Sequence, residues 1–228
     1  MIRINQISKT YKMGKVGLHP MDLLIAPGEI IAFIGGNGAG KSTLIQLLTN
    51  ILKPTTGTID WGEQQFSYMP DDLEFPTHVT AWELLKLLGA IKAVEDEKVL
   101  LAATTVGLQN HLHQRIETFS KGMKQRLAFA QTLLANEDVM ILDEPTNGLD
   151  PYWVKWMQTI LDAKRKEGKT IIFSTHDISF VERLADKMLF FNEGRVLFQY
   201  QAKEWRENPK SLEETILDQL NRVHSSNS

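Results

Sequence analysis

A glycine-rich run at residues 35–43 has the residue types and spacing of a loop that binds polyphosphate. It reads Gly-Gly-Asn-Gly-Ala-Gly-Lys-Ser-Thr, so that Gly35 is followed, after four residues, by a Gly-Lys-Ser triplet. Glycine is needed where backbone N–H groups turn inward around an anion and no Cβ can intrude. We therefore expect a nucleotide to be bound by Gly35, Asn37, Gly38, Ala39, Gly40, Lys41, Ser42 and Thr43.

Lys41 and Ser42 carry the expected chemistry of this loop. The Lys41 ammonium would reach the β- and γ-phosphates of ATP, and the Ser42 hydroxyl would bind Mg²⁺. An apolar run at residues 29–34 predicts a strand before the loop, and residues 43–48 predict a helix after it. The N-terminal dipole of that helix would face the anion. The expected cofactors are therefore ATP and Mg²⁺.

Two adjacent carboxylates end a second apolar run. The run at residues 139–142 is followed directly by Asp143 and Glu144. A continuous apolar run of this kind is typical of a central parallel strand, and ligands gather at the carboxyl ends of such strands. Asp143 fits the acid that binds the metal ion. Glu144 is placed to polarise a water molecule for attack on the γ-phosphate, so the pattern predicts ATP hydrolysis.

Strand-like and helix-like segments alternate along the rest of the chain. The predicted elements are strands at residues 2–8, 21–25 and 169–174, a mainly helical region at about 72–135, an amphipathic helix at 152–167, a hairpin at 188–192 and 195–200, and a last helix at 212–223 with a frayed end at 224–228. This alternation predicts an α/β core with a mostly parallel sheet. Trp153 and Trp156, three residues apart, are expected to pack inside the fold rather than to bind a ligand.

Composition excludes several classes of function. The chain has 228 residues, 25 basic and 28 acidic, with a net charge of −3, which is not the electrostatic footprint of a nucleic-acid-binding protein. It has no cysteine, so disulfides, zinc–thiolate sites and cysteine nucleophiles are excluded. The N-terminal residues lack the pattern of a signal peptide, and no apolar run approaches the roughly 18 residues of a membrane span. Any association with a membrane is therefore expected to be peripheral.

Four ordered motifs resemble those of the ATP-binding cassette (ABC) ATPases. Residues 143–151, Asp-Glu-Pro-Thr-Asn-Gly-Leu-Asp-Pro, resemble the Walker B and D-loop segment, and residues 119–126, Phe-Ser-Lys-Gly-Met-Lys-Gln-Arg, resemble the signature motif. Residues 174–177, Ser-Thr-His-Asp, look like the switch-histidine loop. Tyr11 stands where the family has an aromatic that stacks on adenine, and Val16 is expected to bind the nucleotide with it. The resemblance runs from about residue 2 to residue 200.

The resemblance implies an architecture. It is that of a P-loop NTPase core with a mostly parallel sheet, a small antiparallel β-subdomain and a helical subdomain. Residues 1–205 would form the nucleotide-binding domain, with the helical subdomain at about 72–135. Residues 206–228 would form a C-terminal helix and a flexible tail.

The resemblance also implies a mechanism shared between two chains. Two such domains would close head to tail around two ATP molecules, as a homodimer or a heterodimer. Ser120 and the Gly122 amide of one domain would then donate hydrogen bonds to the γ-phosphate held by the other. His176 would contact the γ-phosphate and sense its presence, and Asp150 would lie in the interface and link the two sites.

Two departures from the family pattern bear on the site. The family usually has Gln where this chain has Asp71, which would give Mg²⁺ a negatively charged ligand on a shorter side chain. The signature has Lys121 and Met123 where its best-known version has Gly and Gln. Ser-Lys-Gly-Met-Lys-Gln-Arg resembles a variant common among ABC exporters.

These features favour one function over two alternatives. The favoured function is that of an ATP-hydrolysing subunit, which lies at the cytoplasmic face of the cell membrane and drives export through a separate transmembrane permease. A soluble ABC-type ATPase acting on ribosomes or DNA typically has two cassettes or a coiled-coil insertion and a basic surface, which this chain lacks. A module that closes on ATP without hydrolysis usually loses the general base, whereas Glu144 is present here.

Overall fold

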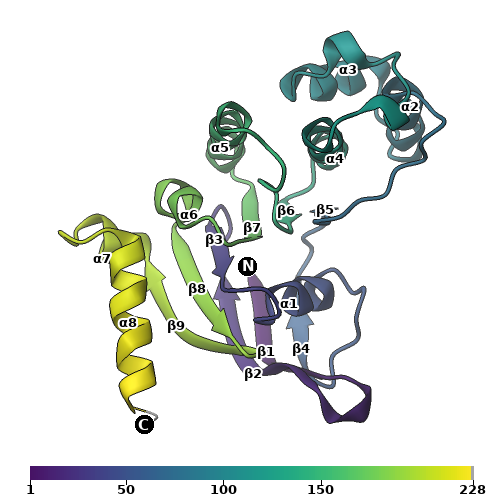
Figure 1. Cartoon of the computed structure of the whole chain (residues 1–228). Coiled ribbons are helices and arrows are strands. Elements are labelled where there is room, and N and C mark those ends of the chain that lie inside the picture. The colour runs from purple at the N-terminus through teal and green to yellow at the C-terminus, as the bar shows by residue number, and fades with distance from the viewer. Residues whose placement is uncertain (227–228) are drawn as a thin grey trace.

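A six-stranded, mostly parallel sheet lies at the centre of the protein, in the order β5-β6-β7-β3-β8-β9 (Figure 1). The computed structural model describes residues 1–226. The strands are β3 (Ile30–Ile34), β5 (Phe66–Met69), β6 (Val139–Leu142), β7 (Thr170–Thr175), β8 (Lys187–Asn192) and β9 (Arg195–Gln201). All neighbouring strands are parallel except β8 and β9, which form the predicted hairpin at the edge. The predicted fold class is confirmed.

The apolar runs of the sequence become strands that are buried on both faces. All five residues of β3 are buried. Ile30, Ala32 and Ile34 belong to the hydrophobic cluster on one face of the sheet, whereas Ile31 and Phe33 belong to the cluster on the other. Because side chains alternate along a strand, a strand covered on both faces has no solvent-facing position, and every residue of β3 is apolar.

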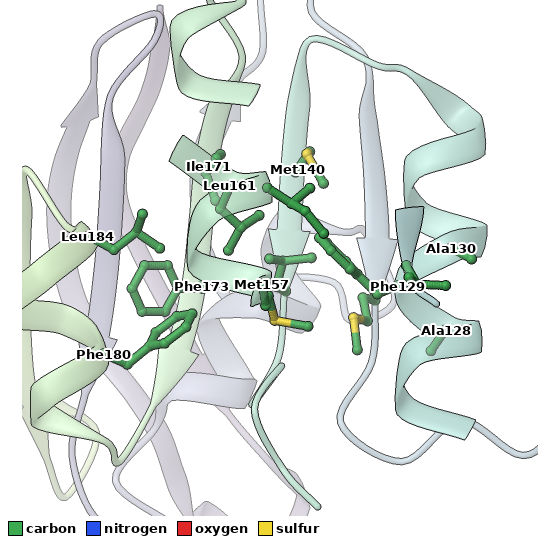
Figure 2. Close-up of a cluster of buried hydrophobic side chains, with 14 of the residues drawn as sticks. Ala128, Phe129, Ala130, Met140, Met157, Leu161, Ile171, Phe173, Phe180 and Leu184 are labelled. Atoms are coloured by element: carbon green, nitrogen blue, oxygen red, sulfur yellow. The ribbon is translucent and has the colours of Figure 1, made fainter. Parts of the chain in front are cut away.

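Three helices cover one face of the central sheet. They are α4 (Lys121–Ala135), α5 (Pro151–Lys166) and α6 (Ile178–Leu184). Figure 2 shows Phe129, Met157 and Leu161 from these helices among Phe173 and other buried apolar side chains of the sheet. This packing fixes the loops after β6 and β7, which carry Asp143, Glu144, Asp150 and His176.

The opposite face carries a small antiparallel sheet and one helix. β1 (Ile2–Thr10), β2 (Val16–Ile25) and β4 (Thr56–Asp60) pair in the order β2-β1-β4, and α1 is Lys41–Leu48. The predicted strands at residues 2–8 and 21–25 were too short. The ladder continues to the pair Thr10 and Val16, because hydrogen bonds to a partner strand extend β structure beyond the apolar pattern.

The helical part of the chain begins with a strong start signal. α2 (Ala81–Ile91) follows a capping box in which Thr80 and Glu83 each accept from the other's backbone N–H. α3 (Asp96–Thr105) and α4 come next, joined by short 3₁₀ turns at Gln109–His111 and Ile116–Thr118. A further 3₁₀ turn, Lys12–Gly14, joins β1 to β2.

Two aromatic residues of α5 contact the C-terminal end of α3 and the first half of α4. The Trp156 indole N–H donates to the Thr105 carbonyl at 2.7 Å. The Arg126 guanidinium lies 4.0 Å from the ring centroid of Trp153 and donates to the Val106 carbonyl at 3.1 Å. Trp153 is half-buried and packs within the fold, as predicted, whereas Trp156 is 42% exposed and lies at the surface, so the prediction that it packs inside the fold was wrong. We refer to Thr105, Val106, Arg126, Trp153 and Trp156 as the α5 joint.

The chain ends in α7 (Ala202–Arg206) and α8 (Leu212–Ser226). The predicted end of the last helix at Val223 was wrong, since neither Gly nor Pro interrupts residues 212–226 and the helix continues. Residues 227 and 228, part of the expected flexible tail, lie outside the described residues. Within residues 1–226, no helix has both the length and the apolar composition needed to cross a membrane.

Candidate nucleotide-binding and hydrolysis site

The predicted phosphate loop lies between β3 and α1, as the sequence indicated (Figure 1). Gly40 caps α1 with a φ of 108°, a left-handed conformation that favours glycine. A Cβ on Gly40 would also lie 3.0 Å from the Gly17 carbonyl oxygen of β2. A cavity of about 470 Å³ opens over the loop and is lined by Tyr11, Lys15, Val16, Gly17, Asn37, Gly38, Ala39, Gly40, Lys41, Ser42, Thr43, Asp71 and Glu144.

Lys41 is a buried cation at the base of this cavity, with only 5% of its surface exposed. Its Nζ donates to the Gly35 carbonyl at 2.6 Å and to the Gly36 carbonyl at 3.2 Å. It also lies 3.5 Å from a carboxylate oxygen of Glu144. A buried ammonium among backbone dipoles fits an anionic phosphate group. Gly35 contributes its carbonyl to Lys41 and does not line the cavity itself.

Asp143 is a buried carboxylate held by two hydroxyl groups. Ser42 Oγ donates to Asp143 Oδ1 at 3.3 Å, and Ser174 Oγ donates to the same oxygen. Burial raises the pKa of Asp143, hydrogen bonds from Ser174 and Ser42 act against this rise, and the nearby charges of Asp71 and Glu144 add to it. A cation beside Asp143 would therefore stabilise its ionised form.

The side chains fit magnesium only as part of a shared ligand set. Among residues 1–226, no group of three or more His, Cys, Asp or Glu could hold a metal ion alone. Mg²⁺ is usually bound by one or two carboxylates, water and substrate phosphates, and Ser42 with Asp143 supplies that kind of set. Asp71 lines the cavity, and its carboxylate accepts a hydrogen bond from Asn147 Nδ2 at 2.6 Å.

Glu144 sits between the phosphate loop and the switch-histidine loop. Its backbone has a φ of 45°, which is uncommon for a residue with a side chain. The Glu144 N–H donates to Ser174 Oγ at 2.9 Å, and Glu144 Oε2 lies 2.9 Å from His176 Nδ1. Glu144 is buried, whereas the His176 side chain is 66% exposed. The predicted base and the predicted sensor are therefore in direct contact.

Tyr11 forms one wall of the cavity beside α1. Its hydroxyl lies 3.2 Å from Thr43 Oγ1. The ring packs on Gly17, where an added Cβ would lie 2.3 Å from a ring atom. Val16 and Lys15 continue this wall. The wall combines an aromatic ring, an aliphatic side chain and a cation, which suits the adenosine part of a nucleotide.

Ser120, Gly122 and Asp150 do not reach this cavity. Ser120 Oγ caps α4 by accepting from the Met123 N–H at 3.2 Å. Asp150 Oδ1 caps α5 by accepting from the backbone N–H groups of Tyr152 and Trp153, at 3.0 and 3.1 Å. The three residues lie at the starts of α4 and α5, so one chain alone does not bring them to its own phosphate loop.

Three site contacts were missed by sequence reasoning. Ser174 joins Asp143 to Glu144, Asn147 binds Asp71, and Lys15 lines the cavity. Ser174 had a detectable signal: β6 and β7 are parallel neighbours, and Leu142 pairs with Phe173, which sets the next residues side by side. The other two contacts depend on loops and had no such signal.

The fold and the site together define a P-loop ATPase, with a phosphate loop after β3 and paired carboxylates after β6. Residues 18–147 match the sequence profile of the family described as ABC transporter. The chain therefore belongs to the ABC transporter family, as an ATP-binding subunit that hydrolyses ATP.

Two curated relatives cover nearly the whole chain. It is 33% identical over 228 residues to the lantibiotic transport ATP-binding protein SrtF of Streptococcus pyogenes, covering 96% of this chain and 97% of SrtF. It is 35% identical over 240 residues to the bacitracin transport ATP-binding protein BcrA of Bacillus licheniformis, covering 98% of this chain and 77% of BcrA.

Solved structures share the fold. The structure of an ATP binding subunit of an ABC transporter matches with a TM-score of 0.86 and 25% identity, covering 96% of this chain and 99% of that one. The dimeric structure of MJ0796, a bacterial ABC transporter cassette, matches with a TM-score of 0.81 and 23% identity, covering 89% of this chain and 99% of that one.

Proposed function

We propose that this chain hydrolyses MgATP at the cytoplasmic face of the cell membrane and drives export through a separate transmembrane permease. Its relatives SrtF and BcrA are named for lantibiotic and bacitracin transport, and a relative from Mycobacterium tuberculosis is named for fluoroquinolone export. No helix within residues 1–226 could itself span a membrane. Peripheral association through a permease accounts for both observations.

One observation carries the hydrolytic assignment. Buried Lys41 lies 3.5 Å from the Glu144 carboxylate, which in turn lies 2.9 Å from His176 Nδ1. In this arrangement Lys41 binds the β- and γ-phosphates, Glu144 orients and polarises the attacking water, and His176 contacts the γ-phosphate. Ser42, Asp143 and Asp71 would hold Mg²⁺, which when bound neutralises phosphate charge.

We further propose that the active unit contains two nucleotide-binding domains. Ser120, Gly122 and Asp150 lie outside the cavity of their own chain, and Ser120 and Asp150 are exposed. In a head-to-tail pair, Ser120 and Gly122 would contact the γ-phosphate held by the other domain, and Asp150 would lie in the interface. The nucleotide-binding domain would be residues 1–205, with its helical subdomain at about 72–135, and residues 206–228 would form the C-terminal helix and tail.

A pull-down from membranes tests the transport assignment. Tagged Glu144→Gln protein is incubated with membrane extract and MgATP, with Lys41→Ala as the control that binds ATP poorly. We expect a polytopic membrane protein to co-purify with Glu144→Gln and to be depleted with Lys41→Ala. Recovery of ribosomal proteins or DNA in place of a membrane protein would overturn the transporter assignment.

A further inference from the structure

The backbone of Glu144 needs external support for its conformation. A φ of 45° at a residue with a Cβ costs free energy and persists only where neighbours hold it. Ser174 Oγ accepts the Glu144 N–H at 2.9 Å on one side. On the other side, the Glu144 carbonyl accepts from Gln125 Nε2 at 3.2 Å. Two buried side chains therefore hold the peptide groups on either side of the Glu144 Cα.

Gln125 is a buried amide on α4, 6% exposed, inside the signature motif. Its Nε2 donates to the Glu144 carbonyl and also to the Pro145 carbonyl at 3.1 Å. The two amide protons thus have two backbone acceptors in successive peptide groups. Removing the donors would leave both carbonyls without these bonds in a buried site.

A second contact joins the start of α4 to the same loop. A Cβ on Gly122 would lie 2.9 Å from the Gly148 carbonyl oxygen, so the two backbones approach as closely as glycine allows. The loop from Glu144 to Gly148 is therefore held by α4 at both ends, through Gln125 and Gly122. A displacement of the start of α4 would reach the Glu144 backbone through these contacts.

We propose that Gln125 is a positioning residue that couples the signature helix α4 to the water-polarising Glu144 of the same chain. This inference rests on the proposed function, in which Ser120 and Gly122 contact the nucleotide of a second domain. Nucleotide bound at one site would then set the position of the carboxylate at the other site. Gln125 contacts neither phosphate nor water itself, and it acts through the Glu144 main chain.

The test substitutes methionine for Gln125. Gln125→Met keeps the length of the side chain and removes both donors. We expect kcat for ATP hydrolysis to fall about 10- to 100-fold, as expected for a misplaced catalytic group, and the Hill coefficient for ATP to move toward one. The ATP affinity should stay close to wild type. The thermal midpoint should fall by about 2–4 °C per kcal/mol lost, because two buried carbonyls lose their donors. Gln131→Met, on the same helix six residues further along, is the matched control and should retain wild-type kcat.

Amide hydrogen exchange measures directly how firmly the loop that contains Glu144 is held. In Gln125→Met, amide exchange should accelerate across residues 143–149 and stay unchanged in β3. If Gln125→Met fails to fold, Gln125→Leu is measured in the same way. Wild-type kcat and cooperativity in the folded variant would overturn the inference, as would parallel losses of ATP affinity and kcat. Absence of ATP hydrolysis by the wild-type protein would instead overturn the proposed function.

Discussion

Asn147 Nδ2 donates a hydrogen bond to Asp71 Oδ1 at 2.6 Å. Asp71 lies in the linker between β5 and α2, and Asn147 lies in the loop after β6. The bond therefore connects two segments: the linker that leads from β5 into α2, and the loop after β6 that contains Glu144. Asp71 is also close enough to Asp143 for its charge to raise the pKa of that carboxyl. Asp71 thus contributes negative charge where the family usually has a neutral Gln.

Asp71→Ala tests the contribution of this charge to Mg²⁺ binding. We expect the Mg²⁺ concentration for half-maximal ATPase activity to rise about tenfold, which corresponds to about 1.4 kcal/mol, since one anionic ligand is lost. Nucleotide affinity without Mg²⁺ should not fall. The measurement is a Mg²⁺ titration at saturating ATP. Asp72→Ala removes an exposed neighbouring carboxylate and is the control; an unchanged Mg²⁺ requirement in Asp71→Ala would exclude Asp71 as a ligand.

Glu144→Gln tests the general base. The amide keeps the shape of the side chain but cannot accept a proton from water, so kcat should fall about 10²- to 10⁴-fold. ATP binding should persist, and size-exclusion chromatography with MgATP should show an accumulated dimer. Turnover at the wild-type rate would remove Glu144 from this role.

Lys41→Ala tests the phosphate contact. The substitution removes a buried cation that lies 3.5 Å from Glu144, and we expect the Kd for ATP to rise about 10- to 100-fold, since hydrogen bonds to charged groups contribute about 1.5–3 kcal/mol. Equilibrium binding of a fluorescent ATP analogue measures the change. Lys12→Ala alters an exposed lysine of the Lys12–Gly14 turn and should leave the Kd unchanged. Wild-type affinity in Lys41→Ala would contradict the phosphate-loop assignment.

Asp143→Asn should stabilise the fold while impairing hydrolysis. Burial raises the pKa of Asp143 above its ordinary value of 3.8, so the folded protein holds this proton more tightly than the unfolded chain. The free energy of unfolding then falls as the pH rises from 3.8 through the raised pKa, and the ionised carboxylate lowers stability at neutral pH. We expect Asp143→Asn to raise the thermal midpoint at about pH 7, by about 2–4 °C per kcal/mol.

The pH dependence of this gain distinguishes it from general packing effects. The difference in thermal midpoint between Asp143→Asn and wild type, measured without Mg²⁺, should narrow as the pH falls toward about 4. Asp162→Asn is a control of opposite sign, because the hydrogen bond from Lys166 lowers the pKa of Asp162. A gain in Asp143→Asn that does not change with pH would contradict the assignment to the buried charge.

The sequence predicted those parts of the site whose residues lie next to one another in a single short segment. Lys41 and Ser42 follow from the phosphate loop, and Asp143 and Glu144 follow from an apolar strand ending in carboxylates. The contact of His176 with Glu144 crosses 32 residues of sequence, and that of Asn147 with Asp71 crosses 76. Such contacts depend on strand order and loop packing, which residue spacing does not encode.

The same limit explains the errors in the fold. The ladder of β1 and β2 extends to Thr10 and Val16 through pairing with another strand, which the apolar pattern of each strand did not reveal. β3, β6 and β7 were predicted because burial on both faces leaves a continuous apolar run within each strand. β5 was not predicted, since Ser67 interrupts its apolar residues.

The α5 joint makes the intrinsic fluorescence of the protein sensitive to how α5 contacts α3 and α4. The chain contains five tryptophans, and two of them, Trp153 and Trp156, contact the Arg126 guanidinium and the Thr105 carbonyl. Indole emission depends on the polarity and the charged groups around the ring. A rotation of the region from α2 to α4 relative to α5 would change both contacts, so such movement can be followed by intrinsic fluorescence without an added dye.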